Sequence, residues 1–244
     1  MLNQLNYQGK NKIEIAIERI KEFEPPEGYY VGISGGKDSD VIVKLMELSG
    51  CKFELHHQHT GLDAPQTVRY VRKQYPETLI DYPKKTIWQL IIENGTPPTR
   101  LMRYCCRELK EYGGEGRFKL LGIRWQESSK RKNNRKMVEL CYKNMTKTLN
   151  PIIDWTEQEI WEFHKIYKLP HNPLYDLGYK RVGCIMCPQK GRKAMLQDAK
   201  MFPKYYQEFI RTFDKMLEVR QGKGLKTTWK TGEEVMKWWL DICK

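Results

Sequence analysis

The sequence predicts an α/β fold, in which helices flank a twisted parallel sheet and a mostly helical part follows at the C-terminus. Short apolar segments alternate with segments of helical periodicity over roughly the first 125 residues. A glycine-bearing turn joins the first apolar segment, YYVGI, to a helix-like segment. Beyond residue 150, aromatic-rich segments with helical spacing replace the alternation. Alternation of this kind is typical of a parallel sheet wrapped by helices.

The individual elements follow from apolar spacing and from helix-breaking residues. Strands are expected at 29–33, 52–60, 78–83 and 117–124. Helices are expected at 11–24, 39–50, 65–75, 86–95, 201–221 and 231–244. Gly50 and Gly95 end two of these helices. Thr156, with Glu159 three residues later, has the capping-box pattern that starts a further helix.

The change in sequence texture predicts a division into three parts. Residues 1–27 form an N-terminal helix, and residues 28–150 form a nucleotide-binding α/β domain. Residues 151–244 form a helical C-terminal region that carries the second of two cysteine pairs.

Composition limits the class of protein. The 244 residues carry a net charge of +13, and such a surplus attracts polyanions such as nucleic acids and nucleotides. No run approaches the roughly 18 apolar residues that a membrane helix needs. The N-terminus lacks the apolar core of a signal peptide. A cytoplasmic protein with no membrane partner is therefore expected.

The turn SGGKDS, residues 34–39, has the chemistry of a phosphate site. Gly35 and Gly36 can adopt backbone angles closed to other residues and let an anion approach the main chain. The helix that follows presents N–H groups that have no partner within the helix. Ser34 and Ser39 add hydroxyl donors, and Lys37 adds a positive charge. The alternative is an ordinary glycine-bearing strand–helix turn.

Four of the seven cysteines occur in two pairs. Cys105 and Cys106 are adjacent, and Cys184 and Cys187 form a C-x-x-C pattern. Disulfides are rare in cytoplasmic chains, so metal or cluster ligation, or redox chemistry, is the better expectation. Four thiolates suit either a tetrahedral zinc ion or a [4Fe–4S] cluster. Two unrelated pairs of packing cysteines remain the alternative.

Several segments together resemble one superfamily. SGGKDS resembles the PP-loop of the adenine nucleotide α-hydrolase-like superfamily, which includes ATP pyrophosphatases, tRNA-thiolating enzymes and the adenylylsulfate (APS) and phosphoadenylylsulfate (PAPS) reductases. HTGLDAPQTVRYV at 59–71 and PIIDWTEQEIW at 151–161 resemble reductase segments. GIRWQES at 122–128 is most similar to the DNA phosphorothioation protein of the PAPS reductase-like group. The resemblance covers roughly residues 28–190 and implies the adenine nucleotide α-hydrolase-like fold.

The resemblance also implies a nucleotide site for ATP or for APS/PAPS. The residues that it assigns to nucleotide binding are Ser34, Gly35, Gly36, Lys37, Asp38, Ser39, Thr60, Gly61 and Arg124. Among these, Lys37, Asp38 and Arg124 are the expected catalytic residues. Asp38 would help to hold Mg²⁺ beside ATP, and Arg124 would meet the anionic end of the nucleotide. A structural ion pair is the alternative role for Arg124.

The cysteine spacing is similar to that of APS reductases. Their [4Fe–4S] cluster is bound by an adjacent pair and, about 80 residues later, by a C-x-x-C pair. The resemblance therefore implies a cluster bound by Cys105, Cys106, Cys184 and Cys187. Lys190, Arg192 and Lys193 follow the second pair and either balance the charge of the cluster or begin a solvated helix.

The C-terminus departs from the reductase pattern. A reductase carries its nucleophilic thiol in a Glu-Cys-Gly-Leu-His segment, whereas this chain ends in VMKWWLDICK. Cys243 alone matches, and nothing nearby except Lys244 would activate its thiol. The favoured function is therefore ATP-dependent adenylylation and sulfur transfer, with nucleic acid as the acceptor.

Two other functions stay open. One is an assimilatory APS/PAPS reductase whose thiol is Cys243 or belongs to a partner. The other is a redox-sensing regulator that binds nucleotide or DNA. The basic segment 130–136 either contacts the phosphate backbone of DNA or tRNA or forms a mobile solvated loop. A cysteine desulfurase or a thioredoxin-type protein is the expected protein partner.

Overall fold

The computed structural model describes residues 1–5, 9–141 and 146–243. Its sheet has six strands in the order β3-β2-β1-β4-β6-β5. The strands are β1 Tyr29–Gly32, β2 Phe53–Gln58, β3 Leu79–Asp81, β4 Phe118–Leu120, β5 Val138–Cys141 and β6 Thr146–Leu149. All neighbouring strands are parallel except β5 and β6, which are antiparallel. The prediction of a mostly parallel sheet with flanking helices is confirmed.

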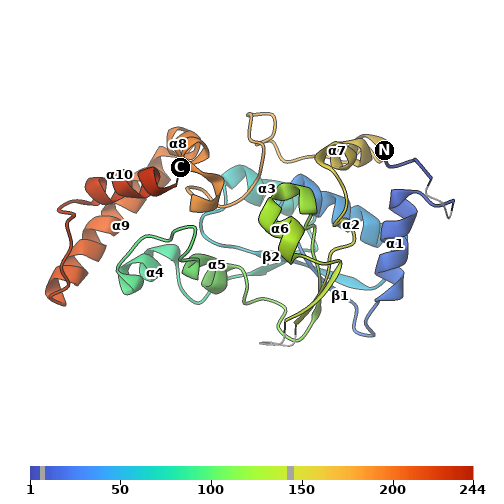
Figure 1. Cartoon of the computed structure of the whole chain (residues 1–244), viewed down its shortest axis with the longest axis horizontal. Helices are drawn as coiled ribbons and strands as arrows, with labels where there is room; N and C mark the ends of the chain where they lie inside the picture. The colour runs from blue at the N-terminus through green and yellow to red at the C-terminus, as the bar shows by residue number, and fades with distance from the viewer. Residues whose placement is uncertain (6–8, 142–145, 244) are drawn as a thin grey trace. The chain divides into compact units, whose positions relative to one another are not determined.

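The helices of the described residues are α1 Lys12–Glu22, α2 Lys37–Ser49, α3 Pro65–Gln74, α4 Ile87–Asn94, α5 Tyr104–Leu109, α6 Ser129–Asn134, α7 Glu157–Ile166, α8 Arg192–Met201, α9 Pro203–Gly222 and α10 Gly232–Ile242 (Figure 1). The seven that the sequence predicts are α1, α2, α3, α4, α7, α9 and α10, and they lie largely where expected. Two short 3₁₀ helices are η1 Trp125–Glu127 and η2 Pro188–Lys190. Gly50 and Gly95 end α2 and α4 in the left-handed conformation, as expected of helix-terminating glycines. Thr156 and Glu159 form the capping box of α7.

The chain divides into two compact units, each built from separate stretches of sequence. The sheet unit comprises Met1–Gln58, Pro65–Asp81 and Gly113–Val182. The cysteine unit comprises His59–Ala64, Tyr82–Tyr112 and Gly183–Lys244. The linear division into residues 1–27, 28–150 and 151–244 stays a prediction about domains.

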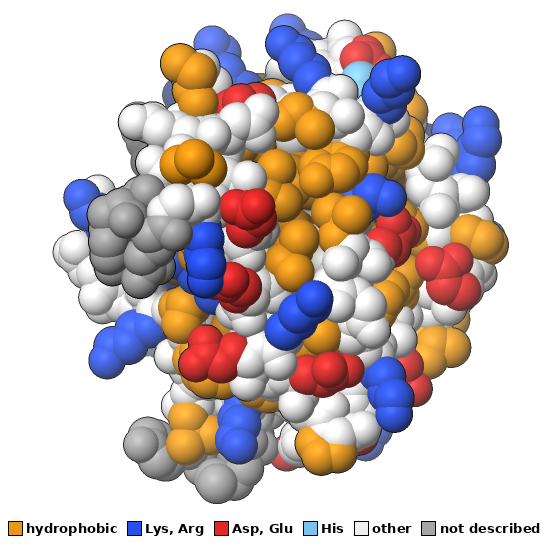
Figure 2. Space-filling model, turned by 90° about the vertical axis from the view of Figure 1, so that its right-hand side faces the viewer, with side chains coloured by type: hydrophobic (Ala, Val, Ile, Leu, Met, Phe, Trp, Pro, Cys, Tyr) orange, Lys and Arg blue, Asp and Glu red, His pale blue; other side chains and the backbone are white. Residues whose placement is uncertain are grey.

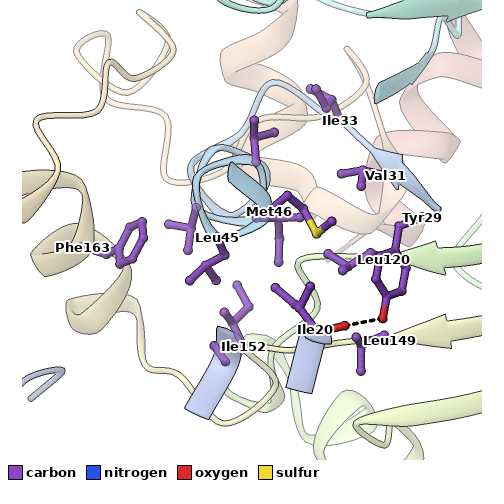
Figure 3. Packing of buried hydrophobic residues seen from close by; sticks show 14 of the residues in the cluster. Ile20, Tyr29, Val31, Ile33, Leu45, Met46, Leu120, Leu149, Ile152 and Phe163 are labelled. Atoms are coloured by element: carbon purple, nitrogen blue, oxygen red, sulfur yellow. Dashed lines mark hydrogen bonds between the residues drawn. The ribbon is translucent and has the colours of Figure 1, made fainter. Parts of the chain in front are cut away.

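The core of the sheet unit lies on one face of the sheet (Figure 3). Val31 of β1 lies on the side of Met46 of α2, whereas Tyr29 points toward Ile20, and all four side chains are buried. The hydroxyl of Tyr29 donates to the main-chain oxygen of Ile20 in α1 at 2.8 Å, which satisfies its polar group inside the core. This packing fixes the start of α2 at the carboxyl end of β1, where parallel sheets place their ligands.

Two strands and two α-helices were not expected from the sequence. The strands β5 and β6 pair as a hairpin at the edge of the sheet. The basic segment, one of whose predicted forms was a mobile loop, contains helix α6, whose N-cap Ser128 accepts from the N–H of Arg131. Helix α5 contains the adjacent cysteines. All three segments are rich in polar residues, which hides their structure from apolar periodicity.

The cysteine unit has an aromatic core of its own. Phe209 and Phe213 of α9 pack against Trp239 of α10, with ring centroids 5.1 and 5.6 Å from the indole. Nε1 of Trp239 donates to the main-chain oxygen of Pro98 at 2.6 Å, so the buried indole has a partner. Among the helices of the described residues, none combines the length and the apolar character that crossing a membrane requires.

Candidate functional site

The glycine turn, Ser34–Ser39, connects β1 to α2 in the sheet unit. Gly35 has a φ of 69°, in the left-handed region that favours glycine. A Cβ on Gly35 would come within 2.9 Å of the side chains of Thr67 and Val71. Both the backbone angle and the packing therefore require glycine at this position.

The donors of the glycine turn converge at the start of α2. The N–H of Gly36 donates to Oγ of Ser39 at 3.2 Å, and Oγ of Ser39 donates to the oxygen of Gly36 at 2.7 Å. Ser34 is exposed, and its Oγ also accepts from the N–H of Gly36 at 3.4 Å. The N–H of Asp38 donates to no group of the described residues. Hydroxyls and main-chain N–H groups at a helix start are the arrangement that binds an anion.

Lys37 lies at the first position of α2 and is only 4% exposed. Its Nζ donates to the main-chain oxygen of Lys180 at 3.3 Å and lies 3.3 Å from Oε1 of Glu157. The same atom lies 5.9 Å from the ring centroid of Trp161 and 5.3 Å from that of Tyr175. Nζ also lies 4.0 Å from Oδ2 of Asp38, so two aromatic faces and two carboxylates surround a buried positive charge beside the turn.

Asp38 and Arg124 form a close ion pair. Nε of Arg124 donates to Oδ1 of Asp38 at 2.5 Å, and the arginine is 4% exposed. Its Nη1 also donates to the main-chain oxygen of Trp155 at 3.4 Å. Gly122 permits the approach of these segments, because a Cβ there would lie 3.0 Å from the oxygen of Asp38. The structural ion pair foreseen for Arg124 is therefore present.

Further positive charge gathers around Arg124. Arg131 of α6 pairs with Glu127, which also accepts from the main-chain N–H of Arg124. Burial lowers the pKa of Arg131, and the neighbouring charge of Arg181 lowers it further. Such a cluster of guanidinium groups favours an anionic guest.

The sequence analysis did not identify three residues that hold the glycine turn in place. His164, Asn172 and Tyr175 hydrogen-bond to main-chain atoms of Gly35 and Lys37. They lie more than 120 positions away in sequence. No local signal marks them, since their role arises only from tertiary contact.

Thr60 and Gly61 belong to the cysteine unit, whereas the glycine turn belongs to the sheet unit. The N–H and the hydroxyl of Thr60 donate to Oδ2 of Asp63 at 2.7 and 3.0 Å. The hydroxyl also lies 3.6 Å from Sγ of Cys184. Gly61 has a φ of 73°, as a tight turn requires. Within its unit, this turn thus lies beside the second cysteine pair.

The four paired cysteines lie together in the cysteine unit. Cys105 and Cys106 are in α5, and Cys187 is the N-cap of η2. The loop with Cys184 is anchored by a hydrogen bond of 2.7 Å from the N–H of Ile185 to the oxygen of Leu62. Burial raises the pKa of Cys187, and the charges of Cys184 and Cys106 raise it further. Thiols from both pairs are therefore within electrostatic reach of one another.

Two cations lie next to these thiols. Cys105 donates to Cys106, and this hydrogen bond together with Arg103 lowers the pKa of Cys106 to about 5. The hydrogen bond that Cys105 donates to Cys106 also raises the pKa of Cys105. Attraction to Cys184 raises the pKa of Lys110. Among these cysteines, Cys106 is thus the one whose surroundings favour the thiolate, the form that binds metals.

The distances between the cysteine Sγ atoms bear on which metal group they could bind. Among the described residues, no three cysteine Sγ atoms lie within 4.8 Å of one another. Four thiolates on one zinc ion lie about 3.8 Å apart, given a Zn–S distance of about 2.3 Å. A four-iron cluster separates its thiolates more widely, because each binds a different iron. Four thiolates can bind either group, so the choice between a cluster and a zinc ion stays a prediction.

Other cationic and thiol groups have structural partners. Nζ of Lys190 lies 3.0 Å from Oδ2 of Asp198, and Arg192 pairs with Asp241 at 3.5 Å. Cys243 is fully buried at 0% exposure, and burial raises the pKa of its thiol. A buried, protonated thiol is a poor nucleophile.

Comparison with known proteins identifies the family. Residues 28–190 match the model of the phosphoadenosine phosphosulfate reductase domain. The chain belongs to this family, and its fold is that of the PP-loop nucleotide-binding proteins.

Individual relatives are distant. An uncharacterized protein of Methanocaldococcus jannaschii is 27% identical over 84% of this chain and 55% of its own length. A second one from that organism is 27% identical, over 92% of this chain and 49% of its own. This chain therefore spans about half the length of these curated relatives. An adenosine 5'-phosphosulfate reductase of Shouchella clausii is 26% identical over 75% of this chain and 80% of its own.

Solved structures share the fold. The phosphate complex of PAPS reductase from Candida auris superposes with a TM-score of 0.54 at 19% identity, over 74% of this chain and 96% of that one. The FMN adenylyltransferase of Candida glabrata, bound to FAD and pyrophosphate, gives 0.50 at 15% identity, over 71% and 62%. At these identities the superpositions show a shared fold.

Proposed function

We propose that this protein is an adenylylating enzyme of sulfur metabolism, which binds ATP at the glycine turn and activates an acceptor for sulfur transfer. The observation that carries the proposal is the convergence of hydroxyl and main-chain donors at the start of α2, beside buried Lys37. Phosphate groups are the natural guests of such a helix start.

The residues have distinct roles in the proposed reaction. An acceptor oxygen attacks the α-phosphorus of ATP, and the bond between the α-phosphorus and the bridging oxygen breaks to release pyrophosphate. Gly35, Gly36, Ser34 and Ser39 hold the leaving pyrophosphate through the turn. Lys37 balances its charge. Catalysis then consists of positioning and charge neutralisation.

The two ends of the ion pair would meet different parts of the ligand. Asp38 would hold Mg²⁺ on the phosphates, and Arg124 would contact the anionic end of the nucleotide. The assignment of Thr60 and Gly61 to nucleotide binding stays a prediction. The acceptor, once it carries AMP, has a leaving group that sulfur can displace.

The four cysteines would hold a [4Fe–4S] cluster. Cys105, Cys106, Cys184 and Cys187 are its ligands in this proposal, with Arg103 and Lys110 balancing its negative charge. When bound, the cluster would supply electrons or sulfur-handling chemistry. Sγ of Cys184 lies 3.6 Å from the Thr60 hydroxyl, and either atom can be the donor of this contact.

An assimilatory APS/PAPS reductase is the second candidate, because the Shouchella relative has that name. The burial of Cys243 argues against it. A reductase thiol must reach the sulfate sulfur of the substrate and must ionise easily. The buried Cys243 does not meet these requirements, which leaves a thiol supplied by a partner, for example one of thioredoxin type, as the form of this candidate.

A nucleic acid is the proposed acceptor, DNA or tRNA. The net charge of +13 and the basic helix α6 support this class of partner. On the face shown in Figure 2, basic side chains are spread among acidic and hydrophobic ones. Binding through contacts between cationic side chains and phosphates is sensitive to salt. The affinity for DNA or tRNA should accordingly fall steeply between about 50 and 200 mM salt.

Calorimetry tests the proposal directly. Anaerobically prepared protein is titrated with ATP·Mg²⁺, then with APS and PAPS. ATP is expected to bind more tightly than either sulfonucleotide. The variant Lys37→Ala should weaken ATP binding at least tenfold, because one buried cation next to the phosphates is lost. Tight APS or PAPS binding with weak ATP binding would instead establish the reductase.

A further inference from the structure

The stretch from α7 to residue 175 holds the main chain of the glycine turn at three points. Nε2 of His164 lies 2.9 Å from the oxygen of Lys37. The side-chain amide of Asn172 donates to the oxygen of Gly35 at 2.9 Å. The hydroxyl of Tyr175 accepts from the N–H of Lys37 at 3.0 Å. The conformation of the turn therefore depends on residues outside it.

Asn172 fixes the direction of one peptide group in the turn. It is completely buried, donates also to Oγ1 of Thr67 at 3.0 Å, and accepts from the N–H of Leu174 at 3.1 Å. In a trans peptide, the C=O and the following N–H point in opposite directions. Because Asn172 holds the C=O of Gly35 on one side, the N–H of Gly36 points to the other. On that side it meets the serine hydroxyls of the turn.

Tyr175 occupies a different donor of the turn. Its phenol oxygen accepts from the first N–H of α2, the kind of group to which an anion binds at a helix start. A Cβ on Gly36 would lie 3.3 Å from this oxygen, so the phenol fills the space directly over the turn. The same ring lies 5.3 Å from Nζ of Lys37. The phenol oxygen thus lies where a phosphate oxygen would accept from Lys37.

We propose that Asn172 and Tyr175 are positioning residues of the phosphate site with opposite effects on anion binding. Asn172 keeps the turn in the form that presents its N–H groups to an anion. Tyr175 holds the N–H of Lys37 and must release it when a phosphate oxygen arrives. This inference rests on the proposed binding of nucleotide phosphates at the glycine turn.

Opposite shifts in affinity test the proposal. The full chain is titrated with inorganic pyrophosphate by calorimetry. Asn172→Ala is expected to weaken binding about tenfold, because the hydrogen bond that orients the carbonyl of Gly35 is lost together with the bond that ties Asn172 to Thr67. Tyr175→Phe keeps the ring but removes the competing oxygen, so binding should tighten about threefold. A loss of fold stability alone would not tighten binding.

Two matched variants provide the control. Asn150→Ala removes a fully buried amide and Tyr29→Phe removes a fully buried phenol oxygen, both in the sheet unit and neither in contact with the turn. Both should lower the Tm and leave the affinity for pyrophosphate unchanged. If Asn172→Ala does not fold, Asn172→Asp, which keeps the shape but loses the donor, takes its place with the same expectation.

The outcomes separate this inference from the proposed function. Suppose first that the wild type binds pyrophosphate and that Lys37→Ala weakens this binding. If the Asn172 variant then binds with wild-type affinity, or if Tyr175→Phe binds more weakly, the inference is wrong but the proposed phosphate site is not. No binding by the wild type, or equal binding by Lys37→Ala, overturns the proposed phosphate site and the inference together.

Discussion

The carboxylate of Asp38 accepts a hydrogen bond from Nε of Arg124 at 2.5 Å, in an ion pair whose arginine is almost entirely buried. Both residues are expected to meet the ligand, yet in the structure each neutralises the other. Removing one partner of a buried pair leaves the other charge uncompensated. The proposed metal and anion sites are therefore coupled, because a Mg²⁺ ion that recruits Asp38 would free Arg124 for the phosphates.

This coupling predicts the behaviour of Asp38→Asn. The variant leaves Arg124 without a counter-charge, so metal-free pyrophosphate should bind about three- to tenfold more tightly than to the wild type. Added Mg²⁺ should improve its binding much less than it improves binding to the wild type. Calorimetry with and without Mg²⁺ measures both effects. An undiminished response to Mg²⁺ would show that Asp38 does not hold the ion.

The cysteine pairs predict the iron content. Protein prepared without oxygen should be brown and contain about four irons per chain. Cys106→Ser should lose most of this iron, because the thiolate that Arg103 stabilises is removed. Cys141→Ser, at an exposed cysteine outside the two pairs, should keep it. Colourless protein with one zinc ion per chain, by metal analysis, would falsify the cluster.

The burial of Cys243 predicts that its thiol is not required for the chemistry. Cys243→Ala should bind ATP and pyrophosphate as the wild type does, with a modest loss in Tm from the small cavity. In the folded wild type, iodoacetamide should label exposed Cys141 much faster than Cys243, as peptide mass spectrometry can show. Loss of sulfonucleotide reduction in this variant alone would return Cys243 to the active site.

Asp40, in the first turn of α2, predicts a pH dependence of stability. Its carboxyl group is 1% exposed and accepts from the hydroxyls of Tyr70 and Tyr75 at 3.0 and 2.9 Å. Burial raises its pKa to about 7, whereas an unfolded aspartate has a pKa of about 3.9. Protonation of the Asp40 carboxyl group therefore favours the folded state. The stability that this preference gives is complete below about pH 4, falls as the pH rises to about 7, and changes little above that.

The variant Asp40→Asn has no proton to lose at this position. Relative to the wild type, its free energy of unfolding should rise by about 2 kcal/mol between pH 5 and pH 7. Urea unfolding of both proteins across this range measures the difference. Parallel pH profiles for the two proteins would rule out Asp40 as the titrating group.

The sequence predicted the elements whose signals are local. The buried strand YYVGI, the glycine that ends α2 and the capping box at Thr156 all appear as expected. The hairpin of β5 and β6 was missed, because its strands lie in a polar, basic stretch with weak alternation. Its position at the sheet edge explains why such strands are tolerated.

The site was predicted only in part for a related reason. The glycine turn and the cysteine pairs are short motifs that can be recognised in sequence, although their roles stay predictions. Asn172 reaches Gly35 across 137 positions, and no pattern in the sequence indicates that contact. The cations beside the cysteines also differ from those considered from the sequence. Arg103 and Lys110 flank the first pair, whereas Lys190 and Arg192 pair with carboxylates.

The close approach of Gly122 to Asp38 has a practical consequence. Gly122 has no side chain, which allows its main chain to approach that of Asp38. A Cβ on Gly122 would lie 3.0 Å from the main-chain oxygen of Asp38, and main-chain atoms cannot rotate away as a side chain can. Gly122→Ala would therefore act as a wedge that separates the two halves of the ion pair by shape alone. It would displace the main chain of Asp38 by a few tenths of an ångström while every charge and every proposed ligand in the chain stays in place.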